Sequence, residues 1–130
     1  MRLILVRHAS AEPASGGPDE LRPLSAEGRA AAQRLGERLA ALAPDAVVSS
    51  PLRRARETAE PIAARAGVEL RLDERLAPGA TVLGVRAAVA GLGETVVGVG
   101  HAPDCDEIVL ALTGRELHLA TGEYHEVELP

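Results

Sequence analysis

Short apolar runs separated by longer amphipathic stretches predict an alternation of strands and helices along the chain. The apolar runs are rich in β-branched residues or alternate with polar ones, and they cover residues 1–6, 46–49, 68–72 and 95–99. Apolar spacing and capping or breaking residues predict helices over 25–43, 51–66, 81–92 and 103–112. Two more short strands, near 117–119 and 123–129, are expected to form a hairpin around 120–122.

Strands that alternate with helices indicate an α/β fold. The expected architecture has three layers: a mostly parallel sheet, helices on both of its faces, and one antiparallel strand near the C-terminus. The length fits a single domain, residues 1–130, and no repeat or long linker divides it. Ser25 can cap the first helix, with Gly28 standing where a Glu would complete the capping box.

Composition narrows the class of protein. The chain is 46% apolar and 25% charged, which is typical of a folded domain. One Tyr and no Phe or Trp leave the core to Leu, Val, Ile and Ala, and provide no aromatic platform for single-stranded nucleic acid. The net charge of −5 gives no general basic surface for nucleic acid or an anionic membrane, so neither is expected as a partner. An anion site would have to be a local basic cluster.

The single cysteine and the hydropathy pattern bear on location. One Cys allows no internal disulfide, which fits a reducing compartment. No apolar run has the length of a membrane span, and the short apolar start does not have the layout of a signal peptide. We therefore expect a cytoplasmic protein.

Basic residues follow three of the predicted strands at the point where each ends. They are Arg7 and His8, then Arg53, Arg54 and Arg56, then His101. In open α/β sheets, ligands bind outside the carboxyl ends of the strands. Guanidinium groups stay charged at any physiological pH and suit phosphate oxygens, a neutral imidazole can attack phosphorus, and a protonated one can bind the oxygens. The pattern predicts a phosphoryl-transfer site with His8 as the nucleophile.

Four sequence blocks resemble a known family. Leu-Val-Arg-His-Ala at 5–9 resembles the Arg-His-Gly signature of the histidine phosphatase superfamily, the phosphoglycerate-mutase-like enzymes. Ser-Ser-Pro-Leu-Arg-Arg-Ala-Arg-Glu-Thr-Ala at 49–59 resembles its second block, and Val-Gly-His-Ala-Pro at 99–103 its third. Arg-Pro-Leu-Ser at 22–25, followed by Gly28, is similar to a segment of the short SixA-like phosphohistidine phosphatases.

The resemblance implies roles for particular residues. His8 would attack phosphorus and become phosphorylated, and water would then hydrolyse the phosphohistidine. The phosphoryl oxygens would be held by Arg7, Arg54 and His101, with Arg22 helping from the loop. Members of the family that act on alcohol esters protonate the leaving group with a carboxylic acid, and Asp-Glu-Arg at 73–75 resembles that segment, with Glu74 as the better match. No cofactor or metal is implied.

The chain departs from the family pattern in two places. Ala9 replaces the signature glycine, which would cost about 1 kcal/mol if the backbone there needs a positive φ. Few residues separate Glu74 from the helix at 81–92, which leaves no room for the lid insertion of the mutases. An open site suits a phosphoryl group carried by another protein, and above all a phosphohistidine, whose labile P–N bond needs little acid catalysis.

Several residues have simpler interpretations. Two of the three arginines at 53, 54 and 56 are expected to be solvated, and Cys105 to be a small buried residue. His118 and His125 are expected to be structural or exposed, and no spacing resembles a metal site. The alternatives to a phosphohistidine phosphatase are a small phosphomonoesterase and a non-catalytic module that binds phosphorylated partners. The sequence leaves the oligomeric state open.

Overall fold

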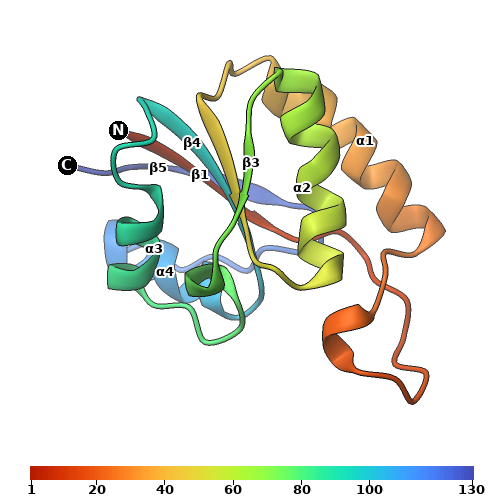
Figure 1. Cartoon of the computed structure of the whole chain (residues 1–130). Helices are drawn as coiled ribbons and strands as arrows, with labels where there is room; N and C mark the ends of the chain where they lie inside the picture. The colour runs from red at the N-terminus through yellow and green to blue at the C-terminus, as the bar shows by residue number, and fades with distance from the viewer.

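A five-stranded sheet forms the centre of the computed structural model, which describes all 130 residues (Figure 1). The strands are β1 (Arg2–Arg7), β2 (Ala46–Ser49), β3 (Leu70–Leu72), β4 (Thr95–Gly100) and β5 (Tyr124–Glu128). Their order across the sheet is β3-β2-β4-β1-β5. Neighbouring strands are parallel except for β5, which runs antiparallel to β1. The mostly parallel sheet with one antiparallel strand confirms the prediction.

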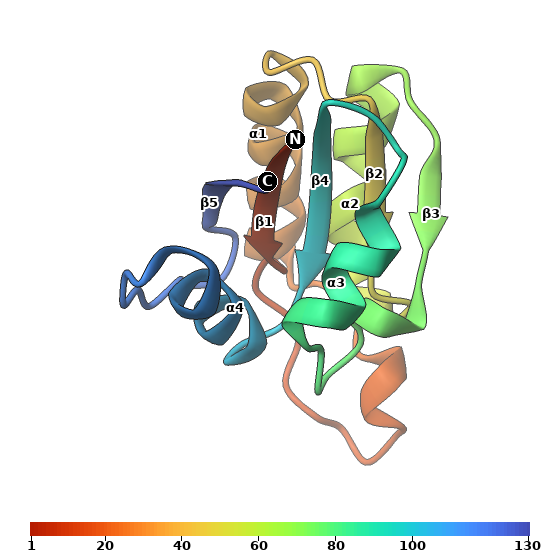
Figure 2. The ribbon, with the colours of Figure 1, turned by 90° about the vertical axis from the view of Figure 1, so that its left-hand side faces the viewer.

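Helices cover both faces of this sheet. Helices α1 (Ala26–Ala40) and α2 (Arg53–Ala66) lie on one face, and α3 (Val82–Val89) and α4 (Asp104–Thr113) lie on the other (Figure 2). The alternation along β1 explains both layers, because Leu3 and Leu5 belong to the core cluster under α3 and α4, whereas Ile4 and Val6 belong to the cluster under α1 and α2. Two short 3₁₀ helices, η1 (Asp19–Leu21) and η2 (Glu74–Leu76), lie in the connections.

The start of α1 is tied to the loop that follows β1. The Ser25 hydroxyl caps the helix by accepting a hydrogen bond from the Gly28 N–H, as predicted. The Ser25 hydroxyl and backbone N–H both donate to the Ser10 carbonyl oxygen. A side chain at position 28 would overlap that same carbonyl. Glycine therefore replaces the glutamate of a capping box because the Ser10 backbone occupies the space.

The expected C-terminal hairpin is wrong. Residues 117–119 form no strand, and β5 pairs with β1 instead, with Tyr124 opposite Val6. The backbone of Leu119 is engaged by side chains: its N–H donates to the Asp106 carboxylate, and its carbonyl accepts from Arg7. These partners come from elsewhere in the chain, so the local strand pattern did not decide the pairing.

Two helices end earlier than predicted. Helix α1 ends at Ala40 rather than at position 43, because the chain turns there and Ala43 has a φ of +51°. Helix α3 ends at Val89 rather than at position 92. No helix of the structure is both long enough and apolar enough to cross a lipid bilayer.

Candidate active site

A cavity of about 450 Å³ opens at the carboxyl ends of β1 and β4. It is lined by five of the residues that the sequence predicts to bind or attack phosphate, namely Arg7, His8, Arg22, Arg54 and His101. The remaining lining residues are Ser10, Ala11, Asp19, Pro78, Ala102 and Thr121. Segments far apart in sequence thus converge on one site.

The sheet brings these segments together. Strands β1 and β4 are parallel neighbours that end level with each other, with Arg7 opposite Gly100, and both point to the same end of the molecule (Figure 2). Beyond them, the His8 N–H donates to the Gly100 carbonyl at 3.0 Å. Strand β2 lies on the other side of β4, and the Ser50 N–H donates to the Val99 carbonyl at 3.0 Å. Three adjacent strand ends therefore supply His8, Ser50 and His101.

The imidazole of His8 is held in the form that a nucleophile needs. Its Nδ1 lies 2.7 Å from the Ala9 carbonyl oxygen, which can only accept, so Nδ1 carries the proton and Nε2 keeps a free lone pair. Burial lowers the pKa of His8, the hydrogen bond to Ala9 opposes this, and the charges of Arg54 and Arg7 lower the pKa further. The ring is therefore neutral at pH 7.

The second imidazole, His101, is nearly buried and also neutral. Its Nε2 lies 2.8 Å from the Ser50 hydroxyl oxygen, and its Nδ1 is buried without a hydrogen-bond partner. Burial and then the nearby His8 lower the pKa of His101 to about 4. The sequence pattern allowed a protonated imidazole to bind the oxygens as charge builds in the transition state; in this structure the His101 ring is neutral, because it is buried and lies near His8 and Arg54.

The arginines differ in how they are held. Arg7 donates from Nη1 to the Leu119 carbonyl at 2.9 Å, while its Nε is buried without a partner. The Arg54 side chain is 9% exposed and donates to the Asp19 carbonyl and carboxylate at 3.0 and 3.1 Å. Arg53 instead forms an exposed (i, i+4) ion pair on α2, and so does Arg56. Of the three arginines on this segment, only Arg54 turns into the cavity.

A buried hydroxyl links α2 to the loop that carries His8. Thr58 Oγ1 donates to the Arg54 carbonyl at 2.8 Å and accepts from the Ala9 N–H at 3.0 Å. Ala9 itself is fully buried and has no positive φ, so the strain considered for replacing the signature glycine does not arise. The backbone around His8 is thereby fixed by a side chain of the second sequence block.

Glu74 is not brought into this cavity. It lies in η2 and lines a separate hollow of about 150 Å³. Asp73 caps η2 by accepting from the Arg75 N–H, and the turn buries Leu76 while it leaves Glu74 exposed. The tight turn therefore leaves the predicted general acid outside the cavity that the two histidines line. The carboxylate that does line the cavity is Asp19.

The remaining cysteine and histidines do not line the cavity. Cys105 is buried, and burial raises the pKa of its thiol to about 12, so it is no nucleophile at pH 7. The His118 side chain is 86% exposed, and His125 is half-buried in β5. No group of three or more His, Cys, Asp or Glu side chains has the arrangement of a metal site.

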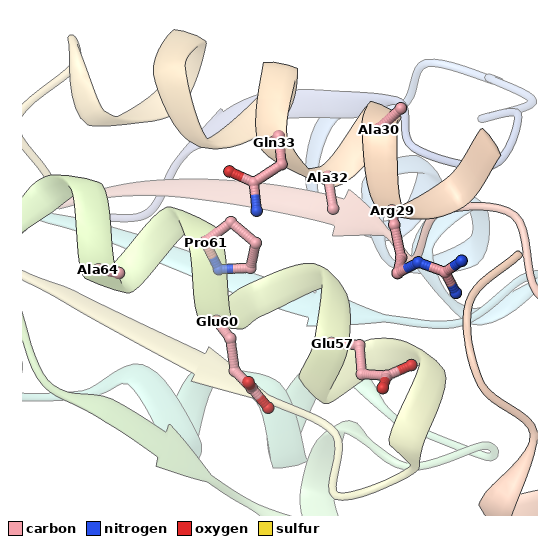
Figure 3. A pocket seen from close by; sticks show the side chains of 8 residues that line it. All are labelled: Arg29, Ala30, Ala32, Gln33, Glu57, Glu60, Pro61 and Ala64. Carbon is pink, nitrogen blue, oxygen red and sulfur yellow. The ribbon is translucent and has the colours of Figure 1, made fainter. Parts of the chain in front are cut away.

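A hollow of about 560 Å³ lies elsewhere, between α1 and α2 (Figure 3). Its polar side chains are Arg29, Gln33, Glu57 and Glu60. Glu57 is already engaged, because its carboxylate accepts from the Leu24 N–H and from Arg53. None of the predicted site residues line this hollow.

Sequence reasoning missed Ser50, which contacts His101, and Asp19, which lines the cavity. Ser50 carried a usable signal, since it is a polar residue at the end of a buried strand, as His8 and His101 are. Asp19 carried none, because it lies in a polar loop without periodicity.

Comparison with known proteins identifies the family. The sequence model of the histidine phosphatase superfamily (branch 1) matches residues 3–78, and the chain belongs to this superfamily. This match supports phosphatase activity, the activity of the superfamily. No curated protein matches the chain in sequence.

Solved structures share the fold. The protein histidine phosphatase SixA, solved with tungstate, is 23% identical with a TM-score of 0.87, covering 99% of this chain and 88% of its own. A SixA from Nakamurella multipartitia, assigned as a phosphohistidine phosphatase, is 30% identical with a TM-score of 0.75, covering 96% and 82%. A mycobacterial glucosyl-3-phosphoglycerate phosphatase is 23% identical with a TM-score of 0.77, covering 96% and 90%. The same fold thus serves proteins with different substrates.

Proposed function

We propose that this chain, as one lidless domain, hydrolyses the phosphoryl group of a protein phosphohistidine through a covalent intermediate on His8. The observation that carries the proposal is the state of His8. Its Nε2 lone pair is free because Nδ1 donates to Ala9, and its ring lines a cavity with three guanidinium groups. A neutral imidazole surrounded by fixed positive charge is suited to attack a phosphoryl dianion.

The first step forms one P–N bond and breaks another. His8 Nε2 attacks phosphorus, and the bond from phosphorus to the substrate imidazole breaks. The leaving ring departs as neutral imidazole when its other nitrogen carries a proton. His8 keeps its own proton on Nδ1, so the phosphorylated ring is cationic, and the hydrogen bond to the Ala9 carbonyl stabilises that charge.

The second step regenerates the site. Water attacks phosphorus, the bond to Nε2 breaks, and the electron pair returns to His8 as the neutral ring it was before. The hydroxyl of water stays on the phosphate, and the other proton of the water is released.

Two buried donors without partners, Arg7 Nε and His101 Nδ1, belong to cavity-lining side chains, and we assign both to the phosphoryl oxygens.

The preference for phosphohistidine over an alcohol ester rests on acid catalysis. An alkoxide leaving group needs a proton, whereas imidazole does not. The one carboxyl group of the cavity, Asp19, has its pKa lowered by hydrogen bonds from Arg22 and Arg54 and by their charges, so it is ionised at pH 7. Glu74 lies outside. The names of similar SixA proteins support the same substrate class.

The test compares substrates under identical conditions. A protein carrying ³²P-phosphohistidine and simple phosphate esters would be supplied to the chain and to His8→Ala. We expect faster release of phosphate from phosphohistidine, and transient label on the chain that is labile to acid, stable to base, and lost in His8→Ala. Faster turnover of esters would favour a small phosphomonoesterase. Binding of the phosphorylated protein by both variants without turnover would indicate a non-catalytic module.

A further inference from the structure

An acidic side chain of the chain itself sits among the arginines of the cavity. Asp19 Oδ1 lies 3.1 Å from Arg22 Nη1, and Asp19 Oδ2 lies 3.1 Å from Arg54 Nη2. The Asp19 backbone carbonyl also accepts from Arg54 Nη1 at 3.0 Å. Two of the groups assigned to the phosphoryl oxygens therefore share an internal carboxylate.

This carboxylate leaves donors of both arginines available. A guanidinium has five N–H donors. Arg54 directs two of them to Asp19, while Arg22 directs one to Asp19 and one to the Glu12 carbonyl. The remaining donors are available to a phosphoryl group, so Asp19 does not block the site. It orients both side chains and lowers the net positive charge of the cavity.

The charge that remains matches a phosphoryl dianion. With neutral histidines, the cavity holds the positive charges of Arg7, Arg22 and Arg54 and the negative charge of Asp19, so its net charge is two positive. Without Asp19 it would be three positive. Inorganic phosphate, the product, carries up to two negative charges near neutral pH and would be held more tightly by the more positive cavity.

We propose that Asp19 sets how tightly the site holds phosphate: its carboxylate positions Arg22 and Arg54 and weakens their attraction for the product, so that phosphate leaves. The inference rests on the proposed function, because it concerns the release of the product of that reaction. It assigns Asp19 an electrostatic and positioning role and no proton transfer.

The test measures binding of inorganic phosphate to the unphosphorylated chain by calorimetry. Asp19→Asn keeps an oxygen acceptor and removes the charge. Glu20→Gln is the matched control, because Glu20 is the next residue in η1, is exposed, and does not line the cavity. We expect the dissociation constant to fall about 3- to 10-fold in Asp19→Asn and to stay unchanged in Glu20→Gln.

The dependence of phosphate binding on salt distinguishes an effect of the Asp19 charge from an effect of side-chain geometry. The difference in dissociation constant between Asp19→Asn and the wild-type chain should shrink as ionic strength rises from about 0.01 to about 0.5 M, because the carboxylate is partly exposed and salt screens its field. Equal or weaker phosphate binding by Asp19→Asn, relative to Glu20→Gln, would overturn the inference and leave the proposed function intact. Absence of phosphate binding by the wild-type chain and by Asp19→Asn alike would also overturn the inference, whereas the comparison of substrates tests the proposed function separately.

Discussion

The hydroxyl oxygen of Ser50 lies 2.8 Å from Nε2 of His101, and this contact determines which nitrogen of the imidazole carries the proton. Ser50 Oγ accepts from the Leu52 N–H, and His101 Nε2 is the one acceptor within reach of the Ser50 hydroxyl proton. If Nε2 carried a proton instead, the buried Ser50 hydroxyl proton would have no partner. Nδ1 of His101 is therefore the protonated nitrogen, and the ring can donate a hydrogen bond while neutral.

Ser50→Ala should disturb His101 more than it disturbs the fold. Loss of the hydroxyl leaves Nε2 buried without a partner, so we expect the two neutral tautomers of His101 to mix and kcat/KM to fall about tenfold, equivalent to about 1.4 kcal/mol. Imidazole ¹⁵N shifts report the tautomer directly. Ser49→Ala is the control, because Ser49 is equally buried but donates to the Ser50 carbonyl. Unchanged His101 shifts in Ser50→Ala would contradict the assignment.

The charge of Arg54 should be visible in the titration of His8. Burial is the main cause of the lowered pKa of His8, and the charge of Arg54 lowers it further. Since a nearby positive charge disfavours the protonated ring, Arg54→Gln should raise the pKa of His8. An NMR titration of the ring, which needs no activity, measures this change. Arg53→Gln should leave the pKa unchanged, because that side chain pairs with Glu57 outside the cavity.

The acid limb of activity follows from the same pKa. The nucleophile must be unprotonated, so kcat/KM should stay high as the pH falls and should decline only below 6.5, the ordinary pKa of histidine. A decline centred at or above pH 7 in the wild-type chain would contradict the neutral, buried state described for His8.

Glu74→Gln should retain activity on phosphohistidine within about threefold of the wild-type chain, since Glu74 lies outside the cavity and imidazole leaves without acid catalysis. Steady-state hydrolysis of a phosphohistidine protein provides the measurement. A loss approaching about 10⁴-fold, the upper range for a general acid, would place Glu74 in the reaction.

Ala9→Gly should raise neither the stability nor the activity of the protein, although it restores the glycine of the family signature. Ala9 has no positive φ and its methyl group is fully buried, so glycine adds freedom to the unfolded chain and removes a packed group. We expect the free energy of unfolding to fall by about 1 kcal/mol, with kcat/KM unchanged. Denaturant titration checks the stability, and a gain in either quantity would contradict the prediction.

The location of the site was predictable from the sequence, because it depends on where the strands end. Apolar runs that stop at Arg7, Ser49 and Val99 located the edge of the sheet, and parallel pairing then brought the basic residues of three segments to one cavity. Resemblance singled out Arg54 from its neighbours, and the structure buries that arginine and exposes the other two.

What the sequence could not predict depends on partners distant along the chain or on tight turns. Asp106 and Arg7 engage the backbone of Leu119 and remove a strand that its local pattern favoured. The 3₁₀ turn capped by Asp73 leaves Glu74 outside the cavity of the histidines. Neither effect has a signature in the hydrophobic periodicity.

The acceptor that holds the Nδ1 proton of His8 is a main-chain oxygen. A peptide carbonyl is present whatever amino acid the codon specifies, so no single replacement at position 9 deletes it. Inactivating variants in this pocket should accordingly concentrate on the imidazole itself, on the guanidinium groups and on Thr58, whose side chain holds the Ala9 backbone in place, rather than on position 9.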